Sequence, residues 1–176
     1  TQDALHVEPA LAAMAVGYEV LLEKPMATTA ADCVALVGAA ERSGRILAVA
    51  HVLRYTAAIR HMKRLLDEGE LGEVITIDHR ENVSYWHMAH AYVRGNWRRA
   101  ADASPMILAK SCHDLDLIAW LMRSGLGGPR CDSRLCTRLS SFGSLMHFRP
   151  DRAPPGAPER CSDGCPAAAE CPFEAQ

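Results

Sequence analysis

The chain has 176 residues, of which 49% are hydrophobic and 23% are charged, as is ordinary for a soluble globular protein. With 19 basic and 21 acidic residues its formal net charge is −2, which excludes the basic surface of a typical nucleic-acid-binding domain. No apolar run reaches the roughly 18 to 20 residues that a membrane-spanning helix needs. The 7 cysteines are odd in number and unevenly spread, so we expect a reducing, cytoplasmic location rather than a disulfide framework.

The first part of the chain alternates between helix and strand patterns. The alanine-rich segment Asp3–Val16 predicts a helix, and Glu19–Leu22 predicts a short buried strand. Thr28 or Thr29 can cap a second helix, after which Ile46–Ala50 predicts a second strand. Helix, strand, helix and strand at such short spacings are typical of a doubly wound parallel sheet.

The pattern changes after the second predicted strand. Tyr55–Glu68 places apolar residues on one side of a predicted helix, and Glu73–His79 predicts a longer strand with one polar face. Such a strand fits an antiparallel sheet that is open on one side. We therefore place a domain boundary between Arg54 and Tyr55. Residues 84–103 carry aromatic and basic side chains with little periodicity, and we expect an ordered loop over a site.

A strong helix signal follows this loop. Ser104 is a candidate cap and Pro105 a first-turn residue of a helix that should run to about Arg123. Ser144–Phe148 predicts a further strand, and the proline-rich residues 149–158 predict a loop. The predicted fold class is therefore α/β, with the end of a parallel sheet followed by an α+β region.

Glu23, Lys24 and Pro25 directly follow the apolar residues of the first predicted strand. Because burying an unpaired charge is unfavourable, the two charged residues should emerge at the carboxyl end of that strand. In open parallel sheets this edge is where ligands bind, and Pro25 stops the strand there because it lacks an N–H. Lys24 is therefore a candidate proton donor or acceptor. The alternative is a surface Glu-Lys pair closed by a proline.

Lys110 and His113 lie three residues apart on the predicted helix, so their side chains should be neighbours. Asp114 and Asp116 are close by in sequence. A histidine beside a carboxylate can be held in one tautomer and used for proton transfer. The alternative is a histidine bonded to a backbone carbonyl in a packed helix.

Cysteines gather near the end of the chain. Cys161, Cys165 and Cys171 have the spacing Cys-x3-Cys-x5-Cys, which differs from the usual short zinc spacings. The candidates for a fourth ligand are His147, Cys131 and Cys136. We therefore expect free thiols, with a metal site on these cysteines as the alternative.

Five motifs together resemble the Gfo/Idh/MocA oxidoreductases, a family that includes glucose–fructose oxidoreductase and inositol dehydrogenase. They occur in the family's order and cover nearly the whole chain: Thr1-x4-His6, Glu23-Lys24-Pro25, His51-x-x-Arg54-Tyr55, Gly95-Asn96-Trp97-Arg98 and Lys110-x-x-His113-Asp114-x-Asp116. The resemblance implies that residues 1–54 are the C-terminal portion of a Rossmann domain that binds NAD or NADP. It implies that residues 55–176 are an incomplete C-terminal α/β domain for substrate binding and oligomerisation, with a large, mostly antiparallel open sheet. A homo-oligomer would form through that sheet.

The resemblance also implies residue roles for hydride exchange at a sugar or cyclitol carbon. The catalytic positions are Lys24 and His113. The positions near the nicotinamide are Thr1, His6, Glu23, Pro25 and Arg54. The substrate positions are Trp97, Arg98, Lys110 and Asp114.

Two departures from the family pattern affect these expectations. Many members carry an aspartate four residues before the histidine, and this chain has Ala109 there, so its proton relay differs. The glycine-rich turn and the acidic residue for the ribose are not among the 176 residues, and we expect them upstream of Thr1. We therefore expect an NAD(P)-dependent dehydrogenase of which this chain is a truncated piece. The alternatives are an NAD-dependent glycosidase of the same family, a non-catalytic fragment that folds or dimerises, and a metal-binding module.

Overall fold

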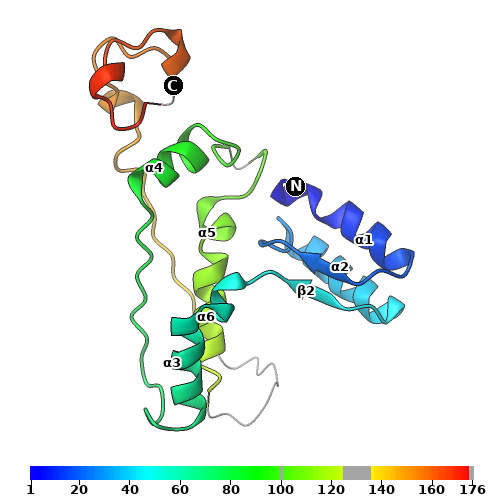
Figure 1. Ribbon diagram of the computed structural model, residues 1–176. Helices are drawn as coiled ribbons and strands as arrows, with labels where there is room; N and C mark the ends of the chain where they lie inside the picture. The colour runs from blue at the N-terminus through cyan, green and yellow to red at the C-terminus, as the bar shows by residue number, and fades with distance from the viewer. Residues whose placement is uncertain (100, 125–135, 175–176) are drawn as a thin grey trace.

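A computed structural model describes residues 1–99, 101–124 and 136–174 (Figure 1). Its first elements are η1 Asp3–Leu5, α1 Val7–Ala15, β1 Val20–Leu22, α2 Ala30–Ser43, β2 Leu47–Val49, η2 Val52–Tyr55 and α3 Ala57–Asp67. The later ones are α4 Tyr85–His87, the π-helix η3 Met88–Val93, α5 Met106–Ala109, α6 Cys112–Leu121, η4 Pro150–Arg152, η5 Cys161–Asp163 and η6 Ala168–Glu170. Within these described ranges, no helix is both long and apolar enough to cross a membrane.

The first part of the molecule contains a parallel pair of strands, as its sequence pattern predicts. Val20 lies opposite Leu47 and Leu22 opposite Val49, with α2 as the crossover between β1 and β2. The core of this part contains Ala10, Met14, Leu22, Ala27 and Leu36, so α1 and α2 cover one face of the sheet. The opposite face is open, because the Leu21 side of β1 is 77% exposed.

The ends of α2 confirm the predicted helix signals. Thr29 is the N-cap, and its hydroxyl oxygen accepts a hydrogen bond of 3.1 Å from the backbone N–H of Asp32. The helix ends at Gly44, whose φ of 64° lies in the left-handed region that glycine adopts without a steric penalty. These local signals operate within a few residues, and so they can be read from sequence.

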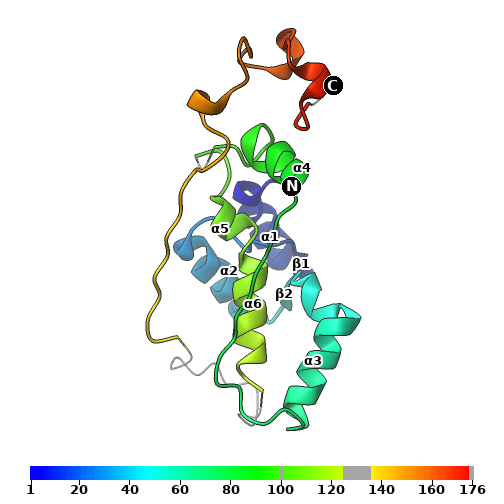
Figure 2. The ribbon, with the colours of Figure 1, turned by 90° about the vertical axis from the view of Figure 1, so that its left-hand side faces the viewer.

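The second part is built on two helices that lie side by side, α3 and α6 (Figures 1 and 2). Lys63 on α3 donates a hydrogen bond of 2.8 Å to the Ser124 hydroxyl, just beyond α6. Its ammonium also lies 5.6 Å from the centre of the Trp120 ring. Residues 68–71 form a turn after α3, and residues 72–84 then run as an extended chain to α4 (Figure 1).

The single helix predicted from Ser104 to Arg123 is wrong, because α5 and α6 are separate. The chain leaves helical geometry between them at Lys110 and Ser111. Ser104 is not the cap either, since the N-cap position of α5 is Pro105. The Ser104 hydroxyl instead donates a hydrogen bond to the Asp3 carboxylate. A contact over this sequence distance is invisible to local cap rules.

Three other predictions about the second part differ from the structure. The segments 73–79 and 144–148 form no strand, because none of the described backbone pairs with them. Residues 85–93, within the segment where we expected a loop, are helical and form α4 and η3. The large antiparallel sheet and the oligomer through it remain predictions. The candidate ligand Cys131 lies outside the described residues.

Candidate functional site

A lysine from the first part of the chain contacts a helix end in the second. Lys24, two residues beyond β1, donates a hydrogen bond of 2.6 Å from Nζ to the carbonyl oxygen of Ala109, the last residue of α5. The neighbouring Glu23 is exposed, and its carboxylate accepts a hydrogen bond of 3.3 Å from the backbone N–H of Lys24. The Lys24 ammonium is therefore directed into the second part of the molecule, which contradicts a simple surface Glu-Lys pair.

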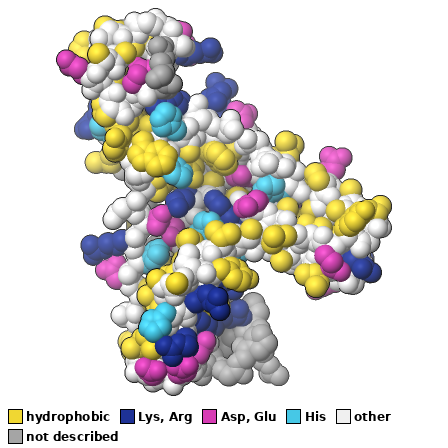
Figure 3. All heavy atoms as spheres, viewed as in Figure 1, with side chains coloured by type: hydrophobic (Ala, Val, Ile, Leu, Met, Phe, Trp, Pro, Cys, Tyr) yellow, Lys and Arg dark blue, Asp and Glu magenta, His cyan; other side chains and the backbone are white. Residues whose placement is uncertain are grey.

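His113 lies close to this contact, in the first turn of α6, and is only 8% exposed. Its ring stands edge-on to that of His51, with ring centres 5.8 Å apart. His51 follows the carboxyl end of β2, as Lys24 follows β1. Parallel strands end at the same sheet edge, so these two residues approach α6 together. Basic, acidic and histidine side chains gather in this middle region of the surface (Figure 3).

The surroundings of His113 lower the pKa of its imidazole below the ordinary value of 6.5. The largest cause is desolvation by burial, followed by the positive charges of Lys24, His51 and Lys110, while Asp114 acts in the opposite direction. At neutral pH the ring is therefore uncharged and able to accept a proton. Its Nδ1 is buried and has no hydrogen-bond partner in the described part of the chain.

Arg54 in η2 and Asp116 in α6 form an ion pair beside the site. The Asp116 carboxylate accepts two hydrogen bonds from the Arg54 guanidinium, at 2.7 Å from Nε and 2.5 Å from Nη2. Nε2 of His51 lies 3.7 Å from the same carboxylate. The guanidinium also lies over the Trp120 ring, 5.2 Å from its centre. Arg54 thus holds the Asp116 carboxylate in place, and that carboxylate offsets the positive charge of the guanidinium.

Lys110 and Asp114 pair with the extended segment 72–84. Lys110 Nζ lies 2.9 Å from the Glu81 carboxylate, and the Asp114 carboxylate is hydrogen-bonded to Nε2 of His79 at 2.8 Å. His79, Glu81 and Asp114 bring possible metal-ligand atoms within 4.8 Å of one another. The ion pair and the hydrogen bond already account for this cluster, because each carboxylate has a partner. Neither pairing could be read from sequence.

The remaining predicted residues lie around η1. His6 is buried, and its Nδ1 shares a hydrogen bond of 2.9 Å with the carbonyl oxygen of Pro25. Thr1 and His6 line a small, mostly apolar cavity of about 190 Å³. Trp97 donates its ring N–H to Asp3 at 3.0 Å, so it joins the two parts of the chain, whereas Arg98 is exposed.

Three residues of this region carried no assigned role in the sequence interpretation. They are His51, Asp116 and the buried Asp3, which accepts hydrogen bonds from both Trp97 and Ser104. His51 had a usable signal, since it follows a predicted strand as Lys24 does. Asp3 had none, because its partners lie about a hundred residues away.

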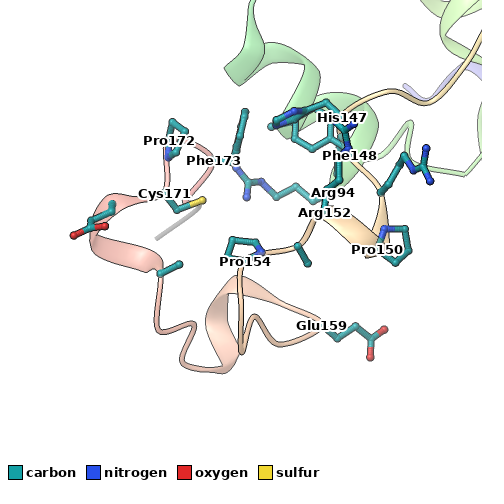
Figure 4. Close-up of a pocket in the computed structure, with 16 residues that line it drawn as sticks. Arg94, His147, Phe148, Pro150, Arg152, Pro154, Glu159, Cys171, Pro172 and Phe173 are labelled. Carbon is teal, nitrogen blue, oxygen red and sulfur yellow. The ribbon is translucent and has the colours of Figure 1, made fainter.

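A larger cavity of about 710 Å³ lies away from this site, between η3 and the C-terminal segment. Figure 4 shows His147, Phe148 and Phe173 along one side and Arg94 and Arg152 beside them. Two of the predicted candidates, His147 and Cys171, line it. Cys161, Cys165 and Cys171 form no disulfide within the described ranges, and Cys161 Sγ accepts a hydrogen bond of 3.3 Å from Arg94. In the same ranges the sulfur atoms form no group that could hold a metal.

Two family profiles match the chain. One, described as the NAD-binding Rossmann fold of the GFO_IDH_MocA oxidoreductase family, matches residues 1–51. The other, described as the C-terminal alpha/beta domain of that oxidoreductase family, matches residues 63–125. Together they cover more than half of the sequence, and the gap between them includes the predicted domain boundary.

Individual relatives agree with these profiles. Inositol 2-dehydrogenase 2 of Saccharopolyspora erythraea is 33% identical over 82% of this chain and 44% of its own length. The 2,7-anhydro-N-acetylneuraminate hydratase of Mediterraneibacter gnavus is 29% identical over 69% of this chain and 32% of its own. The solved WlbA dehydrogenase from Chromobacterium violaceum, in complex with NADH and UDP-GlcNAcA, is 26% identical, with a TM-score of 0.52 over 69% of this chain and 35% of its own. The chain thus spans less than half of each.

Proposed function

Because this chain belongs to the Gfo/Idh/MocA oxidoreductase family, we propose that it is part of an NAD(P)-dependent dehydrogenase. The reaction is hydride transfer between a nicotinamide and a hydroxyl-bearing carbon of a sugar or cyclitol. The substrate class is supported by the inositol dehydrogenase among its relatives, and the cofactor by the NAD-binding profile and the NADH-bound neighbour.

The observation that carries this proposal is the approach of Lys24 to the start of α6. The Lys24 ammonium ends at Ala109, and it lies near enough to His113 to influence the charge of that ring. One cationic donor beyond β1 therefore lies close to one neutral imidazole at the start of α6, whose Nδ1 has no hydrogen-bond partner among the described residues. This is the pair of groups that oxidation of an alcohol needs, since the hydroxyl must lose a proton.

In the proposed reaction the hydroxyl carbon gives up a hydride and the hydroxyl oxygen a proton. NAD(P)⁺ supplies the hydride acceptor when it is bound. Lys24 positions the hydroxyl oxygen and stabilises the negative charge that develops on it. His113 accepts the proton, because its lowered pKa keeps it neutral before the reaction. Oxidation thus leaves a carbonyl, a reduced nicotinamide and a protonated imidazole.

The residues near the proposed cofactor position suit an uncharged ring better than a phosphate. His6 Nδ1 already shares a hydrogen bond with the carbonyl oxygen of Pro25. The Arg54 guanidinium pairs with the Asp116 carboxylate, which offsets the positive charge that would otherwise favour a phosphate. Thr1, His6, Glu23, Pro25 and Arg54 are therefore proposed to shape the nicotinamide side of the site, and the 176 residues contain no glycine-rich turn for the pyrophosphate.

A second candidate function is supported by the hydratase among the relatives. A family member that removes or adds water, or that cleaves a glycoside, would return the nicotinamide to its starting state. Such an enzyme would show product formation without net NADH. The two candidates are separated by following the sugar and the nicotinamide in the same reaction.

The experiment compares the 176-residue chain with the protein encoded by the complete reading frame around it. NAD⁺ and NADP⁺ are titrated into both by calorimetry, and NADH formation is then measured with a panel of cyclitols and aldoses. Each charge-assisted phosphate contact is worth on the order of 1.5–3 kcal/mol, so losing several weakens binding by roughly a thousandfold. We expect binding and turnover in the complete protein only. Micromolar binding by the 176 residues would contradict our placement of the cofactor. No dinucleotide binding by the complete protein would contradict the proposed function and favour a non-catalytic role.

A further inference from the structure

Two imidazole nitrogens in the site have no hydrogen-bond partner in the described part of the chain. They are Nδ1 of His51 and Nδ1 of His113, and both atoms are buried. The two rings meet edge to face, at an interplanar angle of 78° and a centre-to-centre distance of 5.8 Å. The proposed reaction uses His113 and assigns nothing to His51.

The Asp116 carboxylate lies near the His51 ring. Nε2 of His51 lies 3.7 Å from that carboxylate, which is itself fixed by two hydrogen bonds from Arg54. The His51 ring therefore contacts the His113 ring and lies beside a fixed carboxylate.

We propose that His51 is a positioning residue that acts on His113: its ring lies edge-on against the His113 ring, where a positive charge on His51 opposes protonation of His113. Its catalytic meaning rests on the proposed function, in which His113 must be neutral to accept the hydroxyl proton. The ring contact and the effect of charge do not depend on that function.

The other charged groups around His113 come from every neighbouring segment. Lys24 lies beyond β1, Lys110 lies between α5 and α6, and Asp114 follows His113 on α6. After desolvation, the charges of Lys24, His51 and Lys110 lower the pKa of His113, and Asp114 raises it. Of these groups, only a histidine ordinarily changes charge near neutral pH. His51 is therefore the group through which pH can change the environment of His113.

The test follows the imidazole signals of the 176-residue chain by NMR as a function of pH. His51→Gln removes the neighbouring charge, and we expect the midpoint for His113 to rise by several tenths of a pH unit. His51→Phe retains a ring at the edge contact, and we expect the same rise. The matched control is His61→Gln, an exposed histidine on α3, which should leave the His113 titration unchanged.

An unchanged His113 titration in folded His51→Gln and His51→Phe proteins would overturn the proposal. If neither variant folds, the wild-type chain decides. The two histidines should then titrate as a coupled pair with broadened curves, and independent titrations would refute the coupling. In the complete protein, His51→Gln should move the acidic limb of the kcat/KM profile to higher pH with little change in KM for the cofactor. Inactivity of the complete protein with coupled histidines would refute the proposed function alone, whereas activity with uncoupled histidines would refute this inference alone.

Discussion

Replacing Asp116 by asparagine tests whether the ion pair between Arg54 and Asp116 stabilises the molecule. The Asp116 side chain is only 12% exposed and accepts two hydrogen bonds from Arg54, at 2.7 and 2.5 Å. Hydrogen bonds to charged groups contribute about 1.5–3 kcal/mol, and breaking a fully buried ion pair costs about 3–5 kcal/mol. Because the Arg54 side chain is 36% exposed, solvent screens part of this energy. We expect Asp116→Asn to lower the free energy of unfolding by about 2 kcal/mol.

Urea denaturation followed by circular dichroism measures this loss. With a slope of about 2 kcal/mol per molar urea, the midpoint should fall by about 1 M. The matched control is Asp78→Asn, since Asp78 pairs with Arg80 at 3.2 Å but both side chains are exposed, at 76% and 80%. That change should cost no more than about 0.5 kcal/mol. Equal shifts for the two variants would refute the claim that burial makes the Asp116 pair matter.

Three further predictions concern the site and its surroundings. Lys24→Met should lower kcat/KM of the complete protein by at least about 100-fold, and steady-state kinetics showing a smaller loss would exclude Lys24 from proton handling or oxyanion stabilisation. The pKa of His113 is lowered in the folded state, so as pH falls the unfolded chain takes up the proton first. The contribution of His113 to the free energy of unfolding is therefore complete above about pH 6.5 and is lost as pH falls toward the lowered folded pKa. Urea midpoints measured across this range should fall less in His113→Gln than in the wild-type chain. Burial raises the pKa of the Cys112 thiol, so mass spectrometry after mild iodoacetamide treatment should find Cys112 alkylated more slowly than the exposed Cys136.

Much of the first part of the chain followed from sequence because its signals are local. The Thr29 cap, the glycine at the end of α2 and the strands β1 and β2 each depend on neighbours a few residues away. The position of Lys24 at a strand end followed from the same reasoning, since a charge cannot stay within a buried strand. The family resemblance predicts that His113 belongs to the same site, and the two profiles agree with the family itself.

The second part was harder because its contacts are distant in sequence. Ser104 matched the pattern of a helix cap, but its hydroxyl bonds to Asp3, and the helix that it should begin is broken at Lys110 and Ser111. The strand pattern of residues 73–79 shows which side chains could lie on one face of a sheet. It contains no information about whether another segment supplies the hydrogen bonds that make a strand.

Sequence alone determined which residue types stand at the sheet edge and which family they resemble. Tertiary structure alone decided their partners: Lys24 with Ala109, Arg54 with Asp116, and His51 with His113. The physical reason is range. Caps, turns and periodicity act within about one helical turn along the chain, whereas hydrogen bonds, desolvation and charge act through space and depend on which distant residues folding brings together.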